Sequence, residues 1–206
     1  MGYHESLTEG RNAVLEAFRS GKTVDRLFVL DGCQDGPVKT ILREAKKQDT
    51  MVQYVKKERL DQLSETKNHQ GVIAYCAACE YAEVSDILEN AKKKGEAPFI
   101  VLLDGIEDPH NLGAIIRTAN QAGAHGVIIP KRRAVGLTAT VAKTSAGAIN
   151  YTPVAKVTNI SKTIEDLKKQ GMWFVCADMD GTTMYDLNLT GPIGLVIGNE
   201  GSGVGR

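Results

Sequence analysis

The second half of this 206-residue chain alternates apolar segments with amphipathic ones, and no other feature restricts its fold as strongly. The apolar segments cover residues 99–103, 126–130, 173–177 and 193–197. Consecutive apolar residues indicate strands that are buried on both faces, as in a parallel sheet covered by helices. The helices would lie near residues 111–123, 138–146 and 160–170. This pattern predicts an α/β domain built around a parallel sheet.

The first part of the chain predicts a smaller α/β unit. Helical periodicity begins at Arg11 and again at Pro37, where a proline suits the first turn of a helix. A short helix is expected near residues 58–63, and strands at 26–30, 51–55 and 71–79. We therefore expect a first domain over residues 1–82, a linker helix within 83–97 and a second domain over 98–206.

Composition restricts the possible functions. An apolar content of 42% and a charged content of 24% are typical of a globular protein in water. No apolar run approaches the roughly 18 residues of a membrane span, and the N-terminus lacks the basic and apolar regions of a secretory signal. We therefore expect a cytoplasmic protein with no membrane partner.

The net charge of zero argues against binding nucleic acid through overall charge, so any RNA contact would need a local basic cluster. Lys131, Arg132 and Arg133 form the best candidate, directly after the predicted strand at 126–130. Cys76 and Cys79 have the spacing of a metal-binding pair, but in a strand such side chains point to opposite faces. No second pair completes a tetrahedral site, so we expect reduced cysteines and no metal.

Polar residues crowd the junction between the predicted strand at 99–103 and the helix near 111–123. Open α/β sheets place their chemistry at the carboxyl ends of strands. On the helix, the expected buried stripe consists of Leu112, Ile115, Ile116 and Ala119. Arg117 lies well away from this stripe, one turn after Gly113. We interpret the glycine as room through which the guanidinium reaches a phosphate or a ribose hydroxyl.

A glycine-rich turn, Gly198-Asn199-Glu200-Gly201-Ser202-Gly203, follows the last predicted strand. Such a turn lets backbone amides approach a ligand closely. By itself it suggests a dinucleotide fingerprint, but that motif follows an early strand, opens a helix and precedes an acidic residue about 20 positions later. The turn lies too near Arg206 for this pattern, so we do not expect a nicotinamide cofactor.

Three segments agree in order and spacing with one known family. They are Asp104-Gly105-x-x-Asp108-Pro109-x-Asn111-x-Gly113-x-x-x-Arg117-Thr118, Pro130-Lys131-Arg132-Arg133-Ala134-Val135-Gly136-Leu137-Thr138 and Val196-Ile197-Gly198-Asn199-Glu200-Gly201-x-Gly203. The first and last resemble two motifs of the SpoU/TrmH family of RNA ribose 2'-O-methyltransferases. The middle one is similar to the connecting region of its bacterial ribosomal-RNA subgroup.

This resemblance implies a small N-terminal α/β RNA-binding domain, related to ribosomal proteins, and a C-terminal parallel-sheet α/β-knot (SPOUT) methyltransferase domain. It implies a homodimer that transfers a methyl group from S-adenosylmethionine to the ribose of a guanosine in large-subunit ribosomal RNA. Transfer RNA is the alternative substrate. A non-catalytic RNA-binding or ribosome-assembly module is the alternative that is not an enzyme.

The resemblance also assigns roles to residues. Arg117 would act on the target 2'-hydroxyl, as a general base or as the group that stabilises the emerging alkoxide. A guanidinium holds its proton tightly at neutral pH, which favours stabilisation at least as much. Asn111 would fix the loop or hydrogen-bond the arginine, and Glu200 would order the site. The residues expected to hold the cofactor are Ile197, Gly198, Asn199 and Gly201.

A third family motif, a strand and helix containing proline and Ser-Leu-Asn, normally follows the glycine-rich turn, and residues 1–206 do not include it. It completes the knot and the cofactor pocket. We therefore expect this chain to bind S-adenosylmethionine poorly, to show no completed knot, and to have a loose or displaced segment from Gly198 onward.

Overall fold

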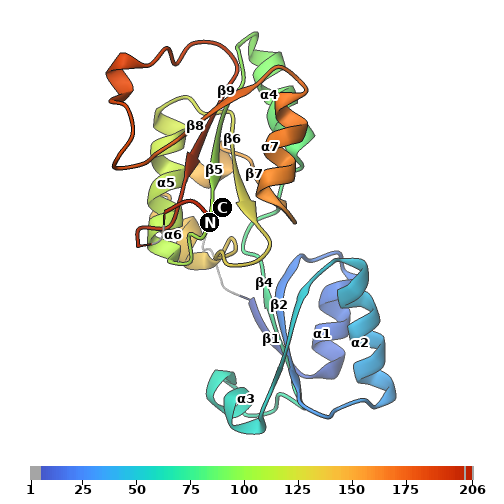
Figure 1. Ribbon diagram of the computed structural model, residues 1–206. Coiled ribbons are helices and arrows are strands. Elements are labelled where there is room, and N and C mark those ends of the chain that lie inside the picture. The colour runs from blue at the N-terminus through green and yellow to red at the C-terminus, as the bar shows by residue number, and fades with distance from the viewer. Residues whose placement is uncertain (1–5, 202, 206) are drawn as a thin grey trace. The chain divides into compact units, whose positions relative to one another are not determined.

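The computed structural model describes residues 6–201 and 203–205, which divide into two compact units (Figure 1). The first unit consists of the chain as far as Glu80 together with the short stretch Gly136–Ala139. The second unit consists of Tyr81–Val135 and the chain from Thr140 onward. Each unit has its own sheet and its own buried core.

The first unit is a four-stranded sheet in the order β1-β4-β2-β3. The strands are β1 (Ser6–Glu9), β2 (Val24–Leu30), β3 (Met51–Val55) and β4 (Val72–Cys76). The helices are α1 (Arg11–Arg19), α2 (Gly36–Lys47) and α3 (Lys57–Leu63). Leu27 and Val29 pack with α1 and α2, whereas the intervening Phe28 packs with Leu60 of α3. Because neighbouring strand residues face opposite ways, α1 and α2 cover one face of the sheet and α3 the other.

Sequence reasoning missed β1, which is short, is polar at most of its positions and pairs only with β4. Its place is decided by that long-range pairing. Of the two cysteines with metal-like spacing, Cys76 ends β4 and is buried, while Cys79 lies beyond the strand. Partial burial raises the pKa of the Cys79 thiol, which makes it unreactive. Among the described residues, no cluster of His, Cys, Asp and Glu could hold a metal ion.

The second unit is a five-stranded sheet in the order β7-β6-β5-β9-β8, with every pair of neighbours parallel. The strands are β5 (Phe99–Leu103), β6 (Gly126–Pro130), β7 (Val154–Val157), β8 (Trp173–Cys176) and β9 (Ile193–Ile197). The helices are α4 (Val84–Lys94), α5 (Pro109–Gln121), α6 (Ala139–Thr144) and α7 (Ile160–Lys168). Figure 1 shows α5 and α6 on one face of this sheet and α4 and α7 on the other. The predicted α/β class with a parallel sheet is confirmed.

Helix α4, which the sequence suggested as a linker, packs as part of the second unit. Its Ile87 and Ala91 are fully buried, and Ile87 lies in one cluster with Ile100 and Leu102 of β5. Strand β7 was not predicted, because it is short and carries the polar Lys156. It forms the edge of the sheet beside β6.

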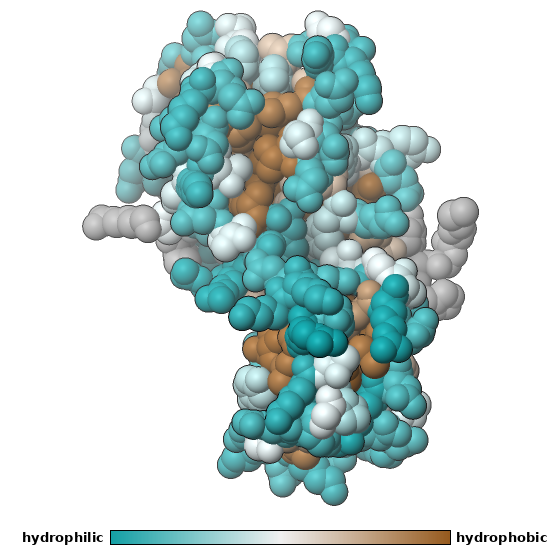
Figure 2. Space-filling model, turned by 90° about the vertical axis from the view of Figure 1, so that its right-hand side faces the viewer, coloured by the Kyte–Doolittle hydropathy of each residue, from teal (hydrophilic) through white to brown (hydrophobic). Residues whose placement is uncertain are grey.

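Apolar side chains remain partly exposed on the face that carries α4 and α7. Those packed on the buried cluster include Val84, Leu88, Val157, Ile160, Ile164 and Phe174. Figure 2 shows a hydrophobic strip flanked by hydrophilic residues. The long connection between β8 and β9 is exposed throughout residues 177–191, with Met179 fully exposed and Tyr185 87% exposed. No helix in the described part of the chain is long and apolar enough to cross a bilayer.

Candidate functional site

The order of the strands points to one edge of the second sheet. The chain passes from β5 outward to β6 and β7, then returns through β8 to β9, which lies on the other side of β5. In open α/β sheets, ligands bind at the carboxyl ends of strands where the order reverses in this way. Leu103 and Ile197, the last residues of β5 and β9, are paired at that position.

The loops that follow β5 and β9 are joined by hydrogen bonds. The Asp104 amide donates to the Ile197 carbonyl at 2.8 Å. The Asn199 side-chain amide donates to the Gly105 carbonyl at 2.9 Å, and its Oδ1 accepts from the Gly201 amide at 2.9 Å. Asn199, expected as a cofactor contact, therefore uses its side chain to hold the turn against the β5 loop.

The glycine-rich turn is not loose. Asn199 and Gly203 exchange two backbone hydrogen bonds, at 3.0 and 2.8 Å. Farther on, the Gly205 amide donates to Asp104 Oδ2 at 2.7 Å, and Val204 packs against the core of the second unit. The expected loose or displaced segment is thus wrong for residues 198–201 and 203–205, because the β5 loop supplies their partners. Ser202 and Arg206 lie outside the described residues.

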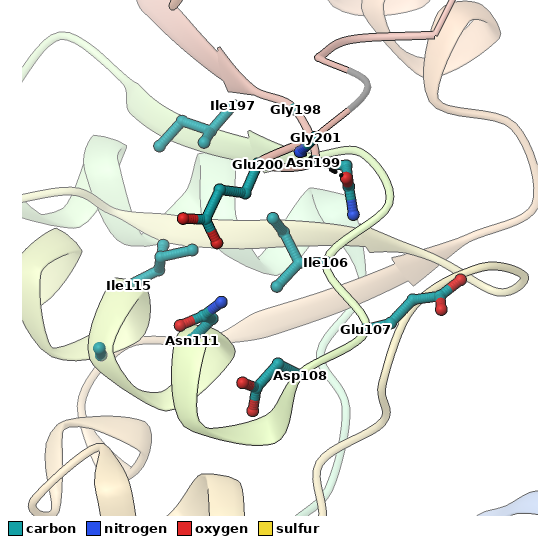
Figure 3. A pocket seen from close by; sticks show the side chains of 11 residues that line it. Ile106, Glu107, Asp108, Asn111, Ile115, Ile197, Gly198, Asn199, Glu200 and Gly201 are labelled. Atoms are coloured by element: carbon teal, nitrogen blue, oxygen red, sulfur yellow. Dashed lines mark hydrogen bonds between the residues drawn. The ribbon is translucent and has the colours of Figure 1, made fainter.

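Between these loops and the first turns of α5 lies a cavity of about 880 Å³ (Figure 3). This volume falls within the range of small-molecule sites. The lining residues are Ile106, Glu107, Asp108, Asn111, Ala114, Ile115, Ile197, Gly198, Asn199, Glu200 and Gly201. The structure therefore brings together the predicted residues of both motifs, with the exception of Arg117. Sequence reasoning missed Ile106, Glu107, Ala114 and Ile115 as lining residues.

The start of α5 places Asn111 and Ile115 on the cavity wall. Asp108 caps the helix by accepting a hydrogen bond from the His110 amide at 2.7 Å, and Pro109 occupies the first turn. Asn111 follows in this turn, and Ile115 lies one turn later on the same face. Ile115 is only partly buried, so its expected place in the buried stripe is wrong. The helix instead buries Leu112, Gly113, Ile116 and Ala119.

Arg117 is exposed and does not line the cavity. Neither Arg117 nor Asn111 makes a side-chain hydrogen bond or ion pair with another described residue. The interpretation of Gly113 as room for the guanidinium is wrong, because α6 fills that room. A Cβ at Gly113 would lie 1.9 Å from Thr144 Oγ1 and 2.9 Å from the Val141 carbonyl oxygen. The glycine is required for the close packing of α5 against α6.

The basic cluster Lys131, Arg132 and Arg133 follows β6, at the same edge of the sheet as the cavity. The Lys131 amide donates to the Val157 carbonyl at 2.8 Å, which anchors the start of the loop. Arg132 and Arg133 are exposed, and Arg133 adopts a left-handed backbone with φ 55°. The cluster lies outside the cavity lining, so it offers positive charge beside the cavity and not within it.

Comparison with known proteins agrees with this arrangement. Residues 98–206 match the SpoU rRNA methylase family, and residues 7–82 match the RNA 2'-O ribose methyltransferase substrate-binding domain. The fold, the cavity and these two matches define an RNA methyltransferase with a separate substrate-binding domain.

Related proteins make the assignment more specific. YacO of Bacillus subtilis, described as a TrmH family tRNA/rRNA methyltransferase, is 48% identical over 199 residues, which cover 96% of this chain and 79% of YacO. A protein of Staphylococcus haemolyticus with the same description is 47% identical over 198 residues, with the same coverage. The chain belongs to the SpoU/TrmH family of RNA methyltransferases.

Solved structures share the fold. AviRb of Streptomyces viridochromogenes, a SpoU methyltransferase in complex with the cofactor AdoMet (S-adenosylmethionine), superposes with a TM-score of 0.55 at 23% identity. The match covers 98% of this chain and 75% of AviRb. An AdoMet-bound rRNA methyltransferase of Sinorhizobium meliloti gives 0.53 at 23% identity, covering 98% of this chain and 73% of that protein.

Proposed function

We propose that this protein uses S-adenosylmethionine to methylate the ribose 2'-hydroxyl of a guanosine in large-subunit ribosomal RNA. The observation that carries the proposal is the meeting of the two family motifs around one cavity at the switch point of the sheet. The match of residues 98–206 to an rRNA methylase family supports ribosomal RNA. Transfer RNA is the second candidate, because the relatives are described as tRNA/rRNA methyltransferases.

The sequence led us to expect weak cofactor binding, but the β5 loop holds the glycine-rich turn in place, and we propose that the residues around the cavity fit S-adenosylmethionine. Ile106, Ile115 and Ile197 offer apolar walls for an adenine ring, and carboxylates can accept hydrogen bonds from ribose hydroxyls and an amino group. Gly198 allows the two arms of the turn to approach each other closely, and Gly201 leaves its backbone accessible. When bound, the cofactor supplies an electrophilic methyl group on a positively charged sulfur. We propose Ile197, Gly198, Asn199 and Gly201 as its contacts, with Asn199 acting by holding the turn.

Arg117 is proposed to act on the RNA. It is exposed and outside the cavity lining, so its partner is a group that approaches from solvent. Its guanidinium would donate hydrogen bonds to the target 2'-oxygen and stabilise negative charge there as the methyl group is transferred. Asn111, at the cavity wall without a side-chain partner among the described residues, would orient the ribose.

The basic cluster is proposed to bind phosphates of the substrate. Replacing Lys131, Arg132 and Arg133 by alanine should weaken RNA binding and reduce the slope of log affinity against log salt, because each phosphate contact releases counterions. Affinity for S-adenosylmethionine should not change, since these residues do not line the cavity. Fluorescence anisotropy with a ribosomal-RNA fragment at several salt concentrations measures both quantities.

The matched control is the triple alanine variant of Lys92, Lys93 and Lys94, three exposed residues at the end of α4. Like the first variant, it removes three positive charges from the second unit. A smaller slope in both variants would indicate an effect of overall charge, and an unchanged slope in the first would exclude the loop as a contact surface.

We further propose a cytoplasmic homodimer, as the resemblance implies. Exposed apolar residues such as Met179 and Tyr185, and the apolar strip between α4 and α7, are the kind of surface that interfaces cover. Sedimentation velocity should show a dimer at micromolar concentration. A monomer under these conditions would contradict the proposal.

The function is tested by incubating the protein with labelled S-adenosylmethionine and unmodified ribosomal or transfer RNA. We expect label in ribosomal RNA and one 2'-O-methylated guanosine, located by mass spectrometry. Label in transfer RNA alone would select the second candidate, and no label in either RNA would contradict the proposed activity.

A further inference from the structure

The charged side chains described in the cavity lining are all acidic. The charged residues among those that line it are Glu107, Asp108 and Glu200, and no lysine or arginine in the described part of the chain joins them. Asp108 already accepts a hydrogen bond from the His110 amide. Glu107 and Glu200 have no hydrogen-bond or ion-pair partner among the described residues. Among the described residues, the lining of the cavity therefore carries excess negative charge.

Glu200 is exposed, and it is the lining carboxylate whose side chain lies over the cavity. Figure 3 shows its side chain pointing toward Asn111 and Ile115, whereas Glu107 points away from the cavity. Apolar Ile106, Ile115 and Ile197 line the same cavity. Solvent screens the field of an exposed carboxylate in part, so its attraction for a nearby cation is modest. A cation is thus favoured in the cavity, and an anion such as phosphate is disfavoured.

The methyl donor and its product differ in the charge of the sulfur. S-adenosylmethionine has a positively charged sulfur. Once the methyl group has left, the sulfur of S-adenosylhomocysteine is an uncharged thioether, and the rest of the molecule is the same. Backbone amides and apolar walls contact the shared parts and do not distinguish the two compounds. A negative side chain near the sulfur does distinguish them.

We propose that Glu200 makes this cavity select the charged methyl donor over the uncharged product. The inference rests on the proposed function, since it requires the cofactor to occupy this cavity. It gives Glu200 a role in specificity: the carboxylate stabilises bound donor and ceases to hold the ligand once transfer is complete. Product inhibition is weakened as a result.

Calorimetric titration of the protein with S-adenosylmethionine and with S-adenosylhomocysteine tests this. The Glu200→Gln variant should lose about fivefold in affinity for the donor, the effect of one nearby charge, and change little toward the product. Glu200→Asp, which keeps the charge, should retain most of the preference for the donor. Glu89→Gln, an exposed site on α4 outside the lining, removes the same charge and should leave both affinities unchanged.

The dependence on salt concentration provides a second test of the preference for the donor. Raising ionic strength to about 1 M should reduce the wild-type preference, because screening weakens the field at the mouth of the cavity. Equal losses of both ligands in Glu200→Gln, or no loss of either, would overturn the inference while leaving the proposed function standing. Failure of the wild-type protein to bind either ligand would overturn the cofactor's placement as well.

Discussion

Arg117→Ala is expected to reduce methyl transfer to RNA by about a hundredfold or more, with the fold and the affinity for S-adenosylmethionine unchanged. The expected loss is large because the guanidinium would stabilise charge that appears on the 2'-oxygen only as the reaction proceeds. The fold should be unaffected, since Arg117 is exposed and has no ion pair with a described residue. Single-turnover transfer of labelled methyl groups at saturating RNA measures the chemical step.

Two further variants give this experiment its controls. Lys162→Ala removes one exposed cation from α7 of the same unit and should leave transfer unchanged. Arg117→Lys keeps the positive charge but loses the forked donor geometry, so it should recover part of the activity if electrostatic stabilisation dominates. An alanine variant that retains more than half of the wild-type rate would remove Arg117 from the mechanism.

Gly198→Ala is expected to disrupt the glycine-rich turn and to lower cofactor affinity by about tenfold or more. A Cβ at this position would lie 2.2 Å from the carbonyl carbon of Gly203 and 2.3 Å from the amide nitrogen of Val204. Backbone atoms cannot rotate away as a side chain can, so the two arms of the turn must separate. Overpacking of this kind costs about 1–3 kcal/mol, and the hydrogen bonds between Asn199 and Gly203 would break with it.

Titration with S-adenosylmethionine and thermal unfolding measure the two effects of this change. Gly181→Ala is the matched control, because the nearest atom to its new Cβ would lie at an ordinary 3.5 Å. That variant should bind the cofactor as the wild type does. Wild-type affinity in Gly198→Ala would show that the turn does not form the cofactor site.

The sequence by itself determined the class of fold and the two ends of the site. Consecutive apolar residues predict buried parallel strands because both faces of such a strand must be covered, and this property is local to each segment. The polar junction after residue 103 and the glycine-rich turn are also visible in short local segments of the sequence. The structure brings them together at one cavity. Strands β1 and β7 were not predicted because they are short and partly polar. They form strands because they pair with β4 and β6, which are distant in the sequence.

The tertiary structure alone decided what each of these residues contacts. Periodicity indicates which face of a helix an amino acid occupies, but not which element lies opposite. Thr144 of α6 thus fills the space beside Gly113, and Ile115 faces the cavity instead of the core. The bonds from Asn199 to Gly105 and from Gly205 to Asp104 hold the turn in place. They join positions far apart in the chain, so only the folding of β5 beside β9 creates them.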